Sequence, residues 1–302
     1  MSLTVMFSRI SVALRSHDRL RRAVDFLFAA FFFRLSPDVR SFLFKGKRHE
    51  CPICGAHVTH FLVLHRPFFR WCPVCRSLQR HRSSWLYIRQ RILPARPVQR
   101  VLHFAPEPAL TQAFHRLPGI TYVSLDLCNP RVTIRANAEH LPFTSEAFDL
   151  IYCSHVLEHV PDDRTAMHEM YRVMRCGGVA IILIPLWNKP TYEDQSITDP
   201  CERERLFGQF DHVRWYGLDI IERLTDAGFV VQTVRIGDVA HACAIEHFGL
   251  DANEILFVLH LQETFSDVVK TDKTGLSKTA HTRWMISAFA NFLPGSTIFR
   301  LA

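Results

Sequence analysis

From residue 100 onward, short apolar runs rich in β-branched residues alternate with stretches of helical periodicity. The runs predict strands at 100–105, 120–126, 132–136, 148–154, 178–185, 229–236 and 254–261. The helical stretches lie at 107–117, 161–175 and 217–227. This alternation is typical of a parallel sheet with helices on both faces, so it predicts an α/β fold.

Before residue 100 the pattern is different. Residues 1–48 contain many arginines and phenylalanines, and the apolar block Phe26–Phe33 is flanked by arginines. A basic amphipathic helix of this kind could lie on a membrane surface or pack on the protein's own core. Apolar positions between Ser77 and Ile92 have helical spacing, which predicts a linking helix that prolines end.

These patterns divide the chain into five predicted parts. They are a basic, Phe-rich helical segment (1–48), a small cysteine-rich ribbon (49–76), a linking helix (77–99), the α/β domain (100–262) and a tail with a docking helix (263–302).

Hydrophobic residues make up 48% of the chain, so it can bury a substantial core. The longest apolar run, Val179–Trp187, has nine residues, whereas a membrane-spanning helix needs about 20. We therefore expect no transmembrane span. The start of the chain has no apolar stretch followed by a small-residue cleavage site, and the cysteine pattern fits a reducing compartment. Together these features predict a cytoplasmic protein, with peripheral membrane contact through 1–48.

Charge is distributed unevenly along the chain. Residues 1–100 contain 19 basic and 4 acidic side chains, whereas the remainder contains 17 and 25. This asymmetry favours a polyanionic partner such as RNA, an anionic membrane surface, or an internal contact between the two parts. A solvated basic face remains an alternative.

Four cysteines form two C-x2-C pairs separated by seventeen residues: Cys51, Cys54, Cys72 and Cys75. This spacing is typical of a zinc ribbon, in which four thiolates complete a closed tetrahedral shell. We therefore predict a structural Zn²⁺ ion, because such a shell has no open position for catalysis.

Several motifs follow one another in the α/β region. The buried strand before the turn H-F-A-P-E at 103–107 is followed by Asp126 at the end of the next predicted strand. Then come L-P-F, F-D-L, H-V-L-E-H-V and R-V-M-x-x-G-G. In this order the motifs resemble the class I S-adenosylmethionine-dependent methyltransferases of the type 11 group. Over residues 50–260, the chain also resembles a subgroup that combines an H-F-A-P-E-type turn with a C-P-x-C ribbon.

The resemblance implies a Rossmann-like, seven-stranded, mostly parallel sheet, preceded here by the zinc ribbon. It also implies S-adenosylmethionine as cofactor, bound at the carboxyl ends of the first, second and fourth strands. The residues that it assigns to the cofactor are His103, Ala105, Glu107, Asp126, Asn137, Ala138 and Ser154. In this assignment the turn faces the methionyl part, Asp126 holds the ribose, Asn137 and Ala138 flank the adenine, and Ser154–His155 lies beneath the sulfonium.

The first turn departs from the family pattern. The family has an acid followed by G-x-G-x-G, whereas the matching positions here are His103, Ala105, Glu107 and Ala109. Since every glycine is missing, we expect a different local geometry, with Glu107 as a substitute for the missing acid. Gly177–Gly178 is predicted to make a left-handed turn.

The polar, aromatic segment 191–217 is too long for an ordinary strand-to-helix loop of about 2–6 residues. Such segments usually shape the acceptor pocket. Within it we predict that Asp211 orients His212, which acts as general base, with His155 and His159 as rivals. The alternative is that His212 and Arg214 pair with carboxylates and hold the loop closed.

The combined features predict a methyltransferase acting on a small molecule or a glycan precursor. Two alternatives remain open. One is an RNA methyltransferase that uses the ribbon and the basic N-terminal third to bind phosphates. The other is a non-catalytic scaffold in which the altered turn has abolished cofactor binding.

Overall fold

The computed structural model describes residues 28–29, 31–63 and 69–261. Its contacts divide the chain into two compact units. The cysteine unit comprises residues 1–95, 107–116 and 236–254, and the sheet unit comprises 96–106, 117–235 and 255–302. The predicted tail at 263–302 and most of residues 1–30 lie outside the described residues. No helix in the described part is long and apolar enough to cross a bilayer.

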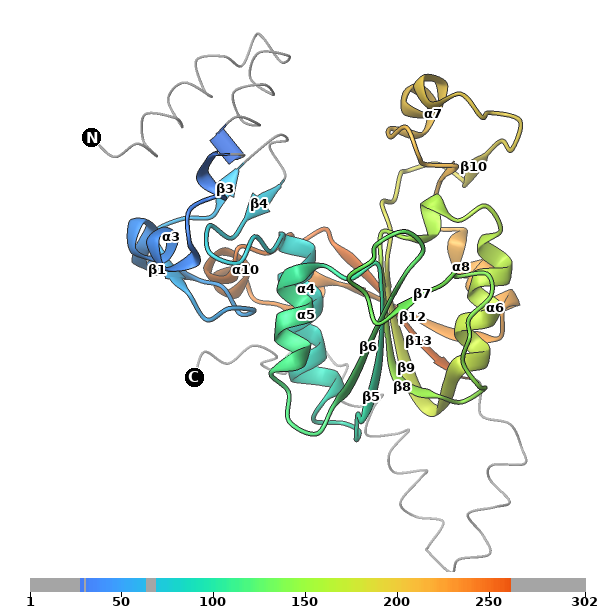
Figure 1. Ribbon diagram of the computed structural model, residues 1–302, viewed down its shortest axis with the longest axis horizontal. Coiled ribbons are helices and arrows are strands. Elements are labelled where there is room, and N and C mark those ends of the chain that lie inside the picture. Colours follow the sequence, from blue (N-terminus) through green and yellow to red (C-terminus); the bar gives the residue numbers. More distant parts are fainter. Residues whose placement is uncertain (1–27, 30, 64–68, 262–302) are drawn as a thin grey trace, which may run out of the picture. The chain divides into compact units, whose positions relative to one another are not determined.

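The sheet unit contains seven strands in the order β12-β13-β9-β8-β5-β6-β7 (Figure 1). Their bounds are β5 (Arg100–Phe104), β6 (Thr121–Asp126), β7 (Ile134–Arg135), β8 (Phe148–Ser154), β9 (Met174–Leu183), β12 (Phe229–Arg235) and β13 (Ile255–Leu261). The five strands from β9 to β7 pair in parallel, and β13 runs antiparallel to both of its neighbours. This sheet confirms the predicted Rossmann-like α/β fold.

The helices and short elements of the sheet unit follow the chain between these strands. They are the 3-10 turn η2 (Leu157–His159), α6 (Asp163–Val173), β10 (Tyr192–Glu193), α7 (Pro200–Phe207), β11 (Arg214–Trp215) and α8 (Ile220–Asp226). Helices α6 and α8 lie side by side (Figure 1). The segment predicted at 191–217 therefore has its own helix, α7, and the two-stranded sheet β10-β11.

Helix α6 shows how the sequence determines an element and its packing. Asp162 caps its first turn by accepting a hydrogen bond from Thr165 N at 3.0 Å. Ala166, Met167, Met170 and Val173 are fully buried in the core of the sheet unit. They recur at helical spacing, so one face of the helix is apolar. This face joins side chains from β5, β8 and β9 in one cluster.

Two glycines explain the turn into β9. Gly177 has a φ of +74°, which confirms the predicted left-handed position. Gly178 is required for space, because a Cβ there would lie 2.8 Å from the carbonyl oxygen of Arg175. The chain can therefore enter β9 close to its neighbouring backbone.

The cysteine unit consists of short elements. They are α3 (Pro37–Phe44), β1 (Lys45–Glu50), β2 (His57–Val58), β3 (Leu62–Val63), β4 (Arg70–Trp71), α4 (Gln79–Tyr87), the π-helical turn η1 (Ile88–Ile92), α5 (Pro108–His115), α9 (Ile236–Val239) and α10 (Ala242–Phe248). Strands β1 and β2 form one antiparallel pair and β3 and β4 another.

Helix α4 belongs to the interior of the cysteine unit. Its Arg82 is fully buried and donates hydrogen bonds to the carbonyl oxygens of Ser77, Arg70, Phe248 and Gly249. One guanidinium thus connects the ribbon with the chain that follows α10. The sequence predicted a linking helix here, but these contacts give α4 a central structural role in this unit.

Candidate functional site

The carboxyl ends of β5, β6 and β8 lie at one edge of the sheet, because these strands are parallel and adjacent. Ala105, Asp126 and Ser154 stand at these three ends. Sequence reasoning assigned all three to the cofactor, and the topology brings the ends of their strands to the same edge. Their individual contacts show what each could do there.

Ala105 has a φ of +43°, which is a left-handed conformation that residues with a side chain rarely adopt. Its N–H donates to the carbonyl oxygen of Leu125 on β6 at 2.8 Å. The turn after β5 therefore has the left-handed backbone that glycine usually supplies, although every glycine is missing.

Asp126 ends β6 and is half-buried. Its Oδ1 accepts hydrogen bonds from the backbone N–H groups of Cys128 at 2.8 Å and Asn129 at 2.7 Å. These bonds fix the carboxylate direction, while Oδ2 has no protein partner within the described part of the chain. A fixed carboxylate with one oxygen available suits recognition of a ribose diol.

Ser154 ends β8 and is 3% exposed. Its hydroxyl has no hydrogen-bond partner among the described residues. A buried hydroxyl without a partner is costly, so this position fits a bound polar group. Asp126 and Ser154 are thus compatible with a nucleoside cofactor at this edge.

Asn137 and Ala138, which the family resemblance assigns to the adenine, follow β7 in the sheet unit. Asn137 bonds Glu139 twice, donating to Oε2 at 2.9 Å and accepting from its backbone N–H at 3.1 Å. Ala138 is buried in the apolar core. The amide of Asn137 is therefore used to shape its own turn.

His103 is fully buried within β5, and its Nδ1 lies 2.9 Å from the hydroxyl of Tyr122. Its ring also packs edge-on against Tyr152 at 5.0 Å. Neighbours on β6 and β8 therefore engage this side chain inside the sheet, so the assignment of His103 to the cofactor stays a prediction.

Glu107 belongs to the cysteine unit, where it precedes α5. Its carboxylate lies 3.1 Å from Nε2 of His81, and both side chains are largely buried. Burial lowers the pKa of His81, while the nearby Glu107 carboxylate opposes that shift. Since the Glu107 carboxylate contacts His81, its role as a substitute acid stays a prediction.

The chain directly after Ser154 carries a histidine and a buried carboxylate. His155 has a φ of +54°, and its N–H donates to Leu183 O at 2.8 Å. Its Nδ1 lies 3.1 Å from Oε1 of Glu158, a side chain that is 1% exposed. The sequence analysis did not predict this pair, although the spacing of three residues was an available signal.

The structure brings Asp211 to His159, so the role of Asp211 and His212 as orienting acid and base stays a prediction. Oδ2 of Asp211 lies 3.3 Å from Nδ1 of His159, and Nδ1 of His212 lies 3.1 Å from Phe207 O. The rings of the two histidines pack edge-on, with centroids 4.7 Å apart. Burial lowers the pKa of His212. Adjacent residues point in different directions here, so Asp211 orients the histidine from η2.

Arg214 holds this segment in place. It is 2% exposed and donates to the carbonyl oxygens of Leu157 and Pro161 at 2.8 Å each. It also pairs with Glu193 at 2.8 Å. The planar guanidinium can satisfy several acceptors at once, so it connects β10 and β11 to the turn after β8. Arg214 thus pairs with a carboxylate in this loop, as the structural alternative expected, whereas Nδ1 of His212 contacts a backbone carbonyl.

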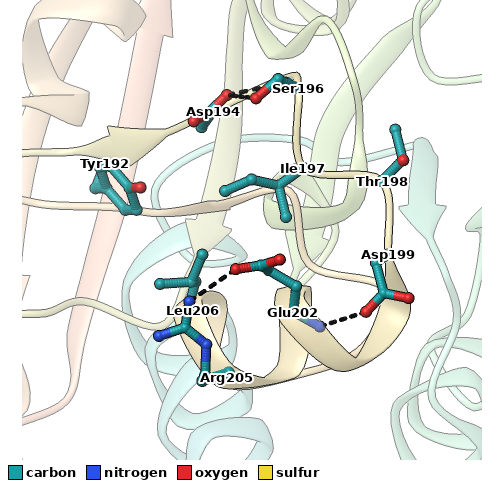
Figure 2. Close-up of a pocket in the computed structure, with 9 residues that line it drawn as sticks. All are labelled: Tyr192, Asp194, Ser196, Ile197, Thr198, Asp199, Glu202, Arg205 and Leu206. Carbon is teal, nitrogen blue, oxygen red and sulfur yellow. Dashed lines mark hydrogen bonds and ion pairs between the residues drawn. The ribbon is translucent and has the colours of Figure 1, made fainter.

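A cavity of about 490 Å³ lies beside α7, and Figure 2 shows the residues that line it. Its lining is mostly polar and includes Tyr192, Asp194 and Glu202. Ser196 donates to Asp194, and Glu202 contacts both Asp199 through its N–H and Arg205 through its carboxylate (Figure 2). A hollow of this size and character could take a small, polar molecule.

The four cysteines of the two C-x2-C pairs come together in the cysteine unit. Their sulfur atoms all lie within 4.8 Å of one another. Cys51 and Cys75 are 3.6 Å apart, and Cys54 and Cys72 are 3.8 Å apart. This cluster is a donor set that could hold one metal ion.

Part of the chain is similar to known proteins. Residues 102–182 match a family described as a methyltransferase domain. The ubiquinone/menaquinone biosynthesis C-methyltransferase UbiE of Xanthomonas oryzae pv. oryzae is 41% identical over 81 residues, covering 25% of this chain and 32% of the relative. The UbiE protein of Haemophilus ducreyi is 29% identical over 103 residues, covering 34% and 37%. The chain thus spans about a third of the length of these relatives.

Solved structures give weaker similarities. The 1,6-didemethyltoxoflavin-N1-methyltransferase of Burkholderia thailandensis has a TM-score of 0.41 and 14% identity, covering 60% of this chain and 76% of its own. A phosphoethanolamine N-methyltransferase of Haemonchus contortus has a TM-score of 0.42 and 14% identity, covering 61% and 53%. The sequence match over 102–182 runs from β5 to β9 and includes α5 of the cysteine unit.

Proposed function

We propose that this chain is an S-adenosylmethionine-dependent methyltransferase. The observation that carries the proposal is the fixed carboxylate of Asp126, which ends the second strand of the sheet inside the methyltransferase domain. Its Oδ2 would accept hydrogen bonds from the ribose hydroxyls, and the Ser154 hydroxyl would find a partner beneath the cofactor. The bound cofactor supplies an electrophilic methyl group on its sulfonium.

We further propose that the acceptor is a hydroxyl group of a small polar molecule or a glycan precursor. The polar cavity between β10 and α7 and the histidines around η2 support this class of acceptor. Methyl transfer is an in-line displacement, so much of the rate comes from positioning the nucleophile. A hydroxyl must also lose its proton, which requires a base near neutral pH.

His155 is our candidate for that base. Its side chain is 30% exposed, whereas His212 is only 8% exposed and has its Nδ1 at a backbone carbonyl. The Glu158 carboxylate beside Nδ1 would orient the imidazole of His155, leave its Nε2 to accept the proton, and stabilise the imidazolium. His155 also directly follows Ser154, at the edge where we place the cofactor.

We propose a structural zinc ion for the four-cysteine cluster. With Zn–S bonds of about 2.3 Å, a regular tetrahedron has sulfur–sulfur edges of about 3.8 Å. The separations of 3.6 and 3.8 Å are close to that edge. Four thiolates fill the coordination shell, so this ion would stabilise the cysteine unit and leave chemistry to the sheet unit.

Calorimetric titration with S-adenosylmethionine and S-adenosylhomocysteine tests the cofactor site. We expect micromolar binding, about −8 kcal/mol, and at least a tenfold loss of affinity in Asp126→Ala. Asp226→Ala is the matched control, because Asp226 is 62% exposed and pairs with Arg164 on the surface. Absence of binding to the folded wild-type chain would refute the methyltransferase proposal.

Replacement of His155 by Gln tests the base once an acceptor has been found by screening. Turnover should fall about 10²- to 10⁴-fold, the usual contribution of a general base, while cofactor affinity stays unchanged. His168→Gln, at an exposed position on α6, should keep wild-type turnover. Equal turnover in His155→Gln and wild type would exclude His155 and return His212 to first place.

A further inference from the structure

A second group of potential metal ligands lies in the sheet unit. Glu158 and His159 belong to η2, and His212 follows α7. One ligand atom from each of the three residues lies within 4.8 Å of the other two. Glu158 and His212 are buried, and His159 is 31% exposed. The cluster is therefore compact, with one partly accessible side.

Both imidazoles are oriented through their Nδ1 atoms. His212 Nδ1 lies 3.1 Å from Phe207 O, and His159 Nδ1 lies 3.3 Å from Asp211 Oδ2. A carbonyl oxygen only accepts, so Nδ1 carries the proton in the neutral ring of His212, and the Asp211 carboxylate favours the same tautomer in His159. The lone pair is then on Nε2. Metal-binding histidines typically have this arrangement, in which the second nitrogen donates to a carboxylate or a carbonyl.

Glu158 lacks the hydrogen bonds that its burial requires. Its side chain is 1% exposed, and neither carboxylate oxygen makes a hydrogen bond of good geometry. His155 Nδ1 approaches Oε1 to 3.1 Å, and Oε2 has no partner in the described residues. A buried carboxylate is expensive unless it is paired or binds a metal ion. Two imidazole lone pairs beside it add no compensating positive charge.

We propose that Glu158, His159 and His212 bind one divalent transition-metal ion. Two imidazole nitrogens and one carboxylate are a donor set that suits zinc and other late first-row metals. The ion would satisfy the buried carboxylate and both lone pairs together. It would also connect η2 to the segment after α7, which Arg214 already joins by hydrogen bonds. Three protein ligands leave a coordination position open, unlike the closed four-cysteine shell.

Zinc content at equilibrium tests the site in the full chain. Wild-type protein is dialysed against buffers with a fixed concentration of free zinc. Bound zinc per chain is then measured by inductively coupled plasma mass spectrometry. We expect the wild type to bind one more ion at saturation than Glu158→Gln, a variant that keeps the side-chain volume. The four cysteines remain intact in both proteins, so their zinc cancels in the comparison.

Two further variants sharpen this test. His159→Ala/His212→Ala should lose the same single ion, and Asp211→Asn should weaken its binding about 10- to 100-fold, because Asp211 orients His159. His168→Ala is the control, since this exposed histidine lies outside the cluster. If circular dichroism shows that the double variant is unfolded, the difference in zinc content between wild type and Glu158→Gln decides whether the site exists.

Equal zinc content in wild type and Glu158→Gln at saturating free zinc would overturn the proposal. The cluster would then be a proton-sharing network of histidines and a carboxylate. Cobalt identifies the site independently: the four thiolates give an intense charge-transfer absorption, whereas the histidine–glutamate site contributes only weak visible bands. Loss of the weak bands in Glu158→Gln, with the intense absorption kept, is the expected result.

These measurements do not depend on the proposed function. Zinc binding by a chain that binds no S-adenosylmethionine would support the metal site and refute the methyltransferase proposal. Cofactor binding without the additional zinc ion would support the methyltransferase proposal and refute the metal site.

Discussion

Two residues with side chains have left-handed backbone conformations at the ends of adjacent strands. Ala105 follows β5 with a φ of +43°, and His155 follows β8 with a φ of +54°. Each costs about 1–2 kcal/mol relative to an ordinary conformation. Such strain persists only where the surrounding structure enforces it, and it is concentrated at functional sites. Both residues lie at the edge where we propose that the cofactor binds.

Ala105→Gly should therefore stabilise the protein by up to about 1 kcal/mol, because glycine adopts this conformation without steric cost. Urea unfolding followed by circular dichroism measures the change. The control is Ala166→Gly, which should destabilise by about 1 kcal/mol or more, because it removes a buried methyl group from the interior of α6. A loss of stability in both variants would contradict the assignment of strain to Ala105.

At the scale of elements, a histidine inside the sheet makes the stability of the fold depend on pH. His260 lies on β13, between β12 and β9. Burial lowers its pKa to about 4, with a further contribution from Arg96 and an opposing hydrogen bond at Gly178. In the unfolded chain the same group titrates near its ordinary value of about 6.5. The folded sheet thus holds this imidazole neutral over a range in which the unfolded chain protonates it.

His260→Gln tests this coupling. Because the folded pKa is lower, the unfolded state binds more protons between pH 6.5 and pH 4, and wild-type stability falls as pH decreases through that window. The loss attributable to His260 should approach about 1.4 kcal/mol per pH unit and total about 2–3 kcal/mol. The difference in unfolding free energy between wild type and variant, measured at pH 7 and pH 5, reports it. A pH-independent difference would contradict the lowered pKa.

At the scale of the molecule, the two compact units depend on different sources of stability. The sheet unit has a continuous apolar core, in which β5, β8, β9 and α6 bury their side chains. The cysteine unit has short strands and buries apolar side chains such as Phe44, Trp85 and Phe114, and the four-sulfur cluster and the buried Arg82 connect its segments. Small units of this kind commonly require a metal to fold.

Removal of zinc should consequently unfold the cysteine unit first. Trp85 is a local reporter, since it is 4% exposed and its indole N–H donates to Pro52 O, inside the first C-x2-C turn, at 3.1 Å. A chelator should shift the tryptophan fluorescence to longer wavelength, and the shift should be smaller in Trp85→Phe, where Trp71 remains as the other tryptophan of this unit. Cys72→Ser should show the shifted emission without chelator. Unchanged emission after complete zinc removal would show that the ion does not maintain this unit.

Most strands and helices of the sheet unit lie where the sequence predicts them, because hydrophobic periodicity and capping residues are local features of the chain. The strand at 148–154 begins and ends where the apolar run does, and α6 lies within its predicted range. β7 is shorter than predicted, only Ile134–Arg135. The long segment at 191–217 contains α7 and the β10-β11 pair, which its mixed polar and aromatic composition did not predict.

The sequence by itself determined the α/β fold, the methyltransferase resemblance and the four-cysteine donor set, because periodicity, motif order and spacing are local properties of the chain. Only the tertiary structure decided which side chains meet. It paired Asp211 with His159 and buried Glu158 beside two histidines. It also grouped 107–116 and 236–254 with the cysteine unit. Such contacts join residues from distant segments, and their partners depend on how the backbone directs each side chain, which spacing along the sequence does not specify.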